Sequence, residues 1–123
     1  MEVKSLSLLI LLLTGCSSVP TPDELSQTVP DTVNSSVKEP TIVAECIVEK
    51  WENYSNIFGN AIVTSRKLGD GVRVAMHTSS AGLYFLADVE RTEQGSKTKT
   101  WTREGLRSYV QDEFDAVVNC QSF

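Results

Sequence analysis

The sequence lacks most of the short motifs that mark enzymes. It holds one histidine and three cysteines among 123 residues; no two cysteines form a CxxC pair, and no GxSxG segment is present. The one Gly-x-Gly segment, Gly69-Asp70-Gly71, lacks the lysine and the following helix of a phosphate-binding loop. Basic residues are also few, with 11 Lys and Arg against 16 Asp and Glu, so a nucleic-acid partner is not expected.

The residues that could still carry catalysis do not form a set. His77 could act as a general base only beside a nucleophile and an orienting acid, and the nearest acid on a neighbouring predicted strand is Asp88. The two lie well apart along the expected ladder, which favours a surface histidine. Three acids near the C-terminus could suggest metal or glycosidase chemistry, but helical spacing spreads them over a solvated surface: Asp112, Glu113 and Asp115. We therefore expect no catalytic residue, no metal ligand and no cofactor.

The longest apolar run lies near the N-terminus and is shorter than the roughly 20 residues that a helix needs to span a bilayer. It follows Lys4 and ends at Leu13-Thr14-Gly15-Cys16. A positive start, an apolar centre and small residues before a cleavage point are the three parts of a secretory signal. The four residues that end the run resemble the lipobox of bacterial lipoproteins.

This resemblance implies how the chain is processed and where it is placed. Residues 1–15 would be a signal peptide, removed by cleavage before Cys16, which would then carry acyl chains such as palmitate on its side chain and amine. Two or more acyl chains hold a protein firmly on a membrane. Because Ser17 rather than Asp follows the cysteine, the resemblance implies the outer membrane of a Gram-negative cell, with the domain facing the periplasm. In a Gram-positive cell it implies the extracytoplasmic surface of the single membrane.

The two other cysteines are then expected to form a disulfide. With Cys16 assigned to lipid, Cys46 and Cys120 remain, and an oxidising compartment would pair them. The bond would close a loop of about 75 residues and stabilise the fold by roughly 4 kcal/mol. The alternative is two buried free thiols.

The segment between Cys16 and the folded domain has the composition of a flexible tether. Residues 17–40 are rich in Ser, Thr, Pro, Val and acids, contain all four prolines and contain no aromatic residue. We expect residues 16–40 to be the lipidated cysteine and a flexible linker, whose ends would lie roughly 25–30 Å apart. A short helical turn after Pro22 is possible. The folded domain is expected to span residues 41–123.

The domain pattern predicts an α+β fold. Helical spacing of apolar residues appears near residues 40–53 and again over 103–120. Between them lie four strand-like segments, at residues 61–67, 72–78, 83–92 and 96–102. Short turns favour an antiparallel meander, and both helices must bury an apolar stripe. The expected architecture is two-layered, a four-stranded antiparallel meander with the N- and C-terminal helices packed on one face (α-β-β-β-β-α).

The sheet face without helices is the candidate binding surface. Strict alternation places seven residues on that face: Arg73, His77, Tyr84, Leu86, Asp88, Thr98 and Thr100. Tyr84 and Leu86 are apolar enough to anchor a contact, with a polar rim around them. A sheet edge that accepts a strand from a partner is a second route to binding.

These observations predict a membrane-anchored, non-enzymatic envelope lipoprotein that binds a protein or glycan partner. One alternative is an inhibitor, immunity or exclusion lipoprotein that protects the envelope. A second is a cell-wall or ester hydrolase with His77 as base. A third is a structural spacer. The sequence leaves the partner and the oligomeric state open.

Overall fold

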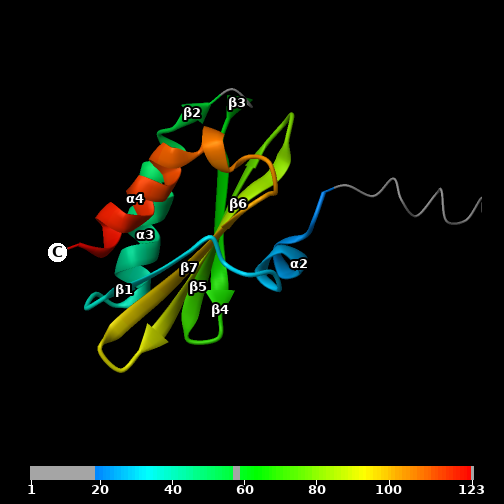
Figure 1. Cartoon of the computed structure of the whole chain (residues 1–123). Coiled ribbons are helices and arrows are strands. Elements are labelled where there is room, and N and C mark those ends of the chain that lie inside the picture. The colour runs from blue at the N-terminus through cyan, green and yellow to red at the C-terminus, as the bar shows by residue number, and fades with distance from the viewer. Residues whose placement is uncertain (1–18, 57–58, 123) are drawn as a thin grey trace, which may run out of the picture.

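One antiparallel sheet of five strands organises the fold (Figure 1). The computed structural model describes residues 19–56 and 59–122, so the lipobox-like segment and Cys16 lie outside the described residues. The strand order is β1-β7-β6-β5-β4, and the strands are β1 (Thr32–Ser36), β4 (Ile62–Leu68), β5 (Gly71–Thr78), β6 (Gly82–Thr92) and β7 (Gly95–Thr102). A separate small hairpin is formed by β2 (Ser55–Asn56) and β3 (Gly59–Asn60).

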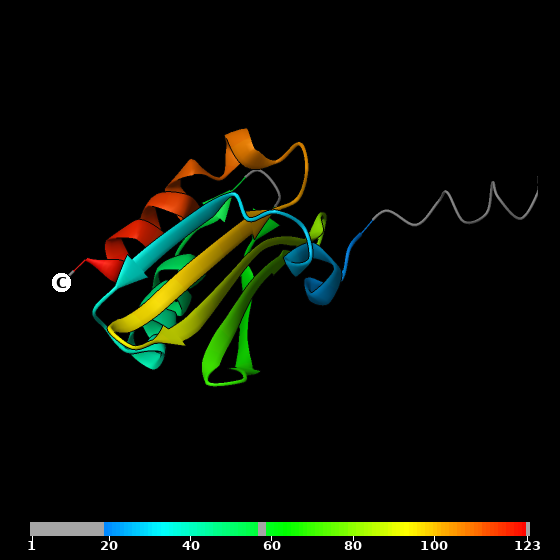
Figure 2. The same cartoon turned by 60° about the horizontal axis from the view of Figure 1, so that its bottom comes forward.

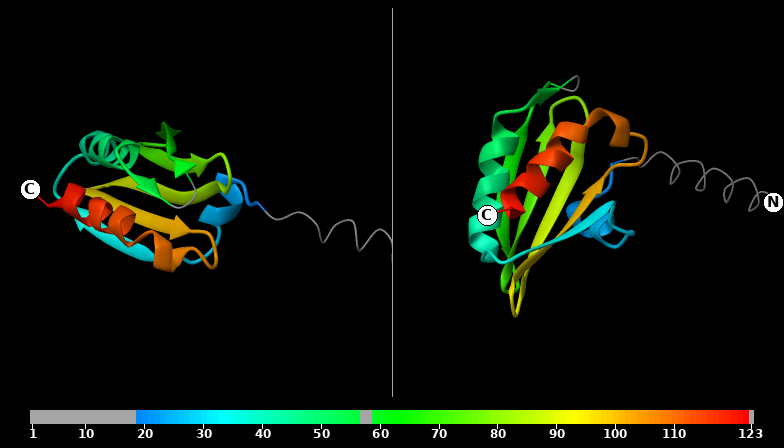
Figure 3. Two further views of the ribbon diagram at one scale, coloured as in Figure 1. Left: turned by 90° about the horizontal axis from the view of Figure 1, so that it is seen from above. Right: turned by 60° about the vertical axis from the view of Figure 1, so that its left-hand side comes forward.

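Two helices pack side by side on one face of this sheet (Figures 1 and 3). They are α3 (Pro40–Glu52) and α4 (Gln111–Gln121). The ring of Phe85 on β6 lies edge-on between Trp51 of α3 and Phe114 of α4, with centroid distances of 4.7 and 4.6 Å. The predicted α+β class is confirmed, but the sheet has five strands rather than four. No helix in the described part of the chain is long and apolar enough to cross a bilayer.

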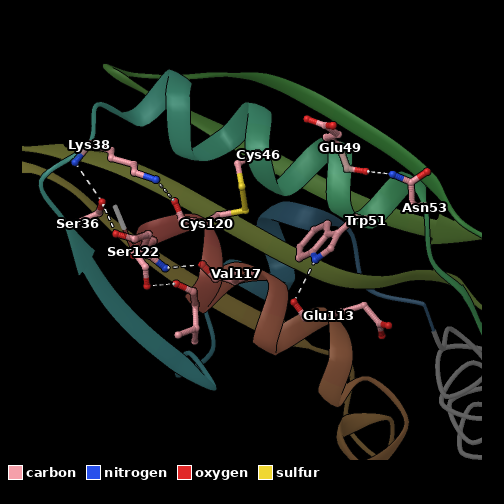
Figure 4. Close-up of a disulfide and its surroundings, with 12 residues drawn as sticks. Ser36, Lys38, Cys46, Glu49, Trp51, Asn53, Glu113, Val117, Cys120 and Ser122 are labelled. Carbon is pink, nitrogen blue, oxygen red and sulfur yellow. Dashed lines mark hydrogen bonds between the residues drawn. A yellow bond between two sulfur atoms is a disulfide. The ribbon is translucent and has the colours of Figure 1, made fainter.

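A disulfide joins the two helices (Figure 4). Cys46 of α3 and Cys120 of α4 are bonded with their Cα atoms 5.6 Å apart, across 74 residues of chain. A second link lies further along the same helix pair, where Trp51 Nε1 donates to the carbonyl of Glu113 at 3.2 Å. The predicted pairing is confirmed, and it fixes α3 against α4.

The expected flexible linker is wrong over most of its length, because its residues belong to the folded domain. After Thr21 the chain forms α2 (Pro22–Ser26), a helix closed by a capping box. The Thr21 side chain accepts from the Glu24 N–H, and the Glu24 carboxylate accepts from the Thr21 N–H at 3.1 Å. Leu25 then packs against the sheet and is 6% exposed. The domain therefore begins near Thr21 and not at residue 41.

The fifth strand, β1, also comes from the predicted linker. It pairs with β7 from Thr32↔Thr100 to Ser36↔Ser96. Hydroxyl groups hold it in place: Thr32 Oγ1 bonds Thr100 Oγ1 at 2.7 Å, and Ser36 Oγ donates to the carbonyl of Gln121 at 2.9 Å. Its one large apolar residue, Val33, is 54% exposed. The strand has no buried apolar face, so apolar periodicity cannot reveal it.

The last helix begins later than predicted. Thr102, which directly precedes the predicted helix, ends β7, and its hydroxyl donates to the carbonyl of Tyr84 at 2.9 Å. The chain then turns at Gly105, whose φ of +87° favours glycine. A short 3₁₀ helix over Arg107–Tyr109 follows before α4 begins at Gln111.

Candidate functional site

The sheet face that we predicted to be an open binding surface is partly covered by α2. Leu25 enters one apolar cluster with Ala75, Leu83, Leu86 and Trp101. Trp101 Nε1 donates to the carbonyl of Thr28 at 2.9 Å, which fastens the segment after α2 to the same face. The prediction that Leu86 is an exposed anchor is wrong, since Leu86 is fully buried. Thr98 and Thr100 of the predicted rim lie on the other face, because they oppose Val89 and Ala87 of the core beneath α3 and α4, and both are fully buried.

Tyr84 lies on the opposite face from the one predicted, because β6 contains a bulge. The register passes from Met76↔Phe85 to His77↔Leu83, which leaves Tyr84 as the extra residue. Strict alternation therefore fails at this point. Tyr84 is fully buried in the core beneath the helices, where its hydroxyl donates to the sulfur of Met76. It cannot anchor a partner.

Arg73 and Asp88, also predicted for the open face, form a buried ion pair. Arg73 Nε and Nη2 donate to the two carboxylate oxygens of Asp88 at 2.7 and 2.8 Å, and both side chains are nearly inaccessible. Arg73 Nη1 donates to Asp23 of α2 at 2.6 Å. Its hydrogen bonds to Asp88 raise the pKa of Arg73. Arg73 therefore keeps its charge, and its bond to Asp23 ties α2 to the sheet.

His77 stays accessible but has no catalytic partner in Asp88. In the register His77 opposes Leu83, whereas Asp88 opposes Arg73 four positions along β5. Both oxygens of Asp88 are held by Arg73. His77 instead lines a groove of about 210 Å³ on the α2 side of β4, with Pro22, Thr64 and Arg66 among its other walls.

A larger groove lies on the other face of β4, between this strand and α3. Its volume is about 430 Å³. Aliphatic side chains of Ala44, Val48 and Val72 line it, and Ser65 and Lys67 contribute from β4. One wall carries an acidic row on the exposed side of α3, formed by Glu45, Glu49 and Glu52. Within the described residues, no cation lies within 4 Å of these three carboxylates.

The strand between the two grooves, β4, is an open edge of the sheet. Its neighbour is β5, joined through a two-residue turn at Gly69-Asp70 in which Gly69 has a φ of +59°. The pair that closes such a turn, Leu68↔Gly71, is hydrogen-bonded, and bonded pairs alternate with non-bonded ones along the ladder. Val63, Ser65 and Lys67 are therefore the residues whose backbone N–H and C=O groups point away from β5. The sequence predicts a sheet edge without locating it, and the topology shows that the two edges are β1 and β4.

Glu113 is a buried carboxylate that sequence analysis placed on the surface. It is 4% exposed, and its Oε2 has no hydrogen-bond partner among the described residues. Burial, and then the nearby charge of Asp112, raise the pKa of Glu113 to about 7. The available signal was its spacing, three residues after Val110 and four before Val117, which are both fully buried. Among residues 19–56 and 59–122, no group of three or more His, Cys, Asp or Glu is placed to hold a metal ion.

Comparison with known proteins finds no matching family model, no matching curated protein and no matching solved structure. The functional assignment therefore rests on the chain's own geometry.

Glu113→Gln should make stability less dependent on pH. Below the ordinary pKa of 4.5 the carboxyl is protonated in both the folded and the unfolded chain, so it costs nothing. As the pH rises toward 7 the unfolded chain ionises first, and the wild type loses stability. We expect the variant to exceed the wild type by on the order of 1–3 kcal/mol at pH 8 and to match it near pH 4. Urea unfolding at both pH values measures this, with exposed Glu45→Gln as control; an equal effect at both would contradict it.

Asp88→Asn should destabilise the fold far more than Asp23→Asn. The first change leaves the buried Arg73 guanidinium without its charged partner, at a cost of about 3 kcal/mol. The second removes a carboxylate that is 75% exposed and screened by water, at a cost under about 1 kcal/mol. Urea unfolding of both variants provides the comparison, and equal losses would show that the buried pair has no special weight.

Proposed function

We propose that this protein is a lipid-anchored, non-enzymatic envelope protein whose domain binds a protein partner along β4. The observation that carries this proposal is the open β4 edge with a groove on each of its faces, about 430 Å³ toward α3 and about 210 Å³ toward α2. A partner strand could bond the outward backbone groups of β4 while its side chains enter the two grooves. Recognition by strand addition uses this arrangement. The disulfide bonds α3, which forms one wall of the larger groove, to α4.

The cysteine arrangement supports the anchored location. The bond between Cys46 and Cys120 calls for an oxidising compartment and leaves Cys16 as the one remaining cysteine. Cys16 stands where the lipobox resemblance requires a lipid-bearing residue. The proposed site of action is the periplasmic side of the outer membrane in a Gram-negative cell, or the outer surface of the membrane in a Gram-positive one.

The folded α2 shortens the proposed tether. Four residues lie between Cys16 and Thr21, the N-cap of α2, and even a fully extended chain spans only about 18 Å from Cys16 to Thr21. The domain would be held close to the lipid surface rather than on a long coil. This favours a partner that lies at the same membrane.

The geometry favours a protein partner over the alternatives. A glycan would stack on exposed aromatic rings, but Trp51 and Trp101 are buried, and the exposed Tyr109 lines neither groove beside β4. A hydrolase with His77 as base is not favoured, because both carboxylate oxygens of Asp88 are bonded to Arg73 and Asp88 does not orient His77. An inhibitor or immunity role remains the special case in which the partner is itself an enzyme or toxin.

The native protein should carry acyl mass on Cys16 and no reactive thiol. Intact-mass spectrometry of membrane-extracted protein, alkylated without reduction, should show a chain starting at Cys16 with added fatty acyl groups and no alkyl adduct. After reduction two adducts should appear, on Cys46 and Cys120. An unprocessed N-terminus without acyl mass would refute the anchor.

Photo-crosslinking in intact envelopes tests the binding surface. A photoreactive residue at Ser65 or Glu49 should capture one and the same partner protein, because both positions line the α3 groove. The matched control is Asn119, an exposed residue of α4 outside this groove. Capture at Asn119 equal to that at Ser65, or no capture at any position, would overturn the proposed binding role.

A further inference from the structure

We infer that the occupant of the β4 edge is an extended protein segment with Lys or Arg at alternate positions, which adds a sixth strand to the sheet. This inference rests on the proposed function and names the chemistry of its partner. It follows from three features of the site: the unpaired backbone row, the grooves on both faces and the charge of one wall.

The backbone row fixes the conformation of the partner. The N–H and C=O groups of Val63, Ser65 and Lys67 point outward, so a chain that satisfies them must itself be extended. Seven residues of β4 span about 23 Å, and the thirteen-residue α3 spans about 20 Å beside them. A segment of about seven residues therefore matches both the edge and the groove wall.

The two grooves determine which positions along the partner segment carry basic side chains. Side chains of an added strand point alternately to the two faces of the sheet, so every second one enters the α3 groove. There it meets the row of Glu45, Glu49 and Glu52. Arg66 and Lys67 are the basic residues of the groove lining, and Arg66 is paired with Asp23 of α2 at 3.5 Å. The row spans about 10 Å along the helix, and alternate residues of a strand stand about 7 Å apart. Two basic side chains of the partner can thus lie along it.

The same charge argues against a second copy of this chain as occupant. Two β4 edges paired antiparallel around a two-fold axis would place both α3 helices on one face of the joined sheet. Their rows of Glu45, Glu49 and Glu52 would then face each other and repel. The opposite sheet edge is less suited, because β1 has five residues rather than seven and packs against α4.

Hydrogen exchange on the full acylated chain in detergent micelles tests the inference at the level of single amides. The probe is a nine-residue peptide of alternating Lys and Thr. Adding it should slow exchange at Val63, Ser65 and Lys67, whose amides point away from β5 in the free protein. Thr64 and Arg66 are bonded to β5 already and should change little, so they serve as internal controls.

Two matched peptides and two matched variants sharpen the test. A peptide of alternating Glu and Thr, and one with the lysines in a single block, should each bind at least tenfold more weakly. Ser65→Pro removes an outward N–H without breaking a bond to β5 and should reduce affinity at least tenfold. Glu45→Gln with Glu49→Gln should reduce it about fivefold and weaken its salt dependence. The control is Asp112→Asn with Asp115→Asn on α4, which should leave binding unchanged.

The outcomes separate this inference from the proposed function. If the acidic peptide slows exchange as much as the basic one, the inference of Lys or Arg at alternate positions is wrong. If a partner is captured at Ser65 but exchange at the three amides is not slowed, the inference of strand addition is wrong. In both cases the binding role would stand. A crosslinked homodimer through β4 would also overturn the inference. Absence of any crosslinked partner would remove the proposed function itself.

Discussion

The central strand of the sheet, β6, is buried on both faces, and the rest of the structure follows from excluding water from both. Every residue of β6 from Leu83 to Val89 is buried. An antiparallel sheet commonly leaves one face to water, but β6 requires cover on each side. The helices α3 and α4 supply one layer, and α2 supplies part of the other. The disulfide and the Arg73–Asp88–Asp23 contacts hold these layers in place.

Covering both faces leaves the sheet edges as the natural place for recognition. A face filled by Leu25 and Trp101 cannot accept a partner unless α2 leaves. At β4 the covering helices stop short of the edge, and grooves remain on either side. The proposed binding mode therefore uses a surface that the packing leaves open, and it requires no rearrangement of the core.

The elements that sequence analysis found are those with strong local signals. The helix over residues 40–53, the four strands between residues 61 and 102 and the disulfide each follow from periodicity, turn residues or cysteine chemistry. The helix α2 was expected only as a short turn within a linker, because Leu25 is its one buried residue. The strand β1 was not predicted, because hydroxyl contacts rather than a buried apolar face hold it. The bulge at Tyr84 leaves no trace in the pattern, yet it moves that side chain from the predicted binding face into the core.

The sequence by itself determined the α+β class and the paired cysteines, and it carries the resemblance that implies a lipid anchor at Cys16, because these depend on local pattern and on the chemistry of single residues. Only the tertiary structure decided that residues 21–40 are part of the domain, that the predicted face is closed and that β4 is the open edge. Those facts depend on which distant segments lie side by side. Burial of Leu25, Arg73 and Glu113 is a property of their neighbours and not of their own sequence positions.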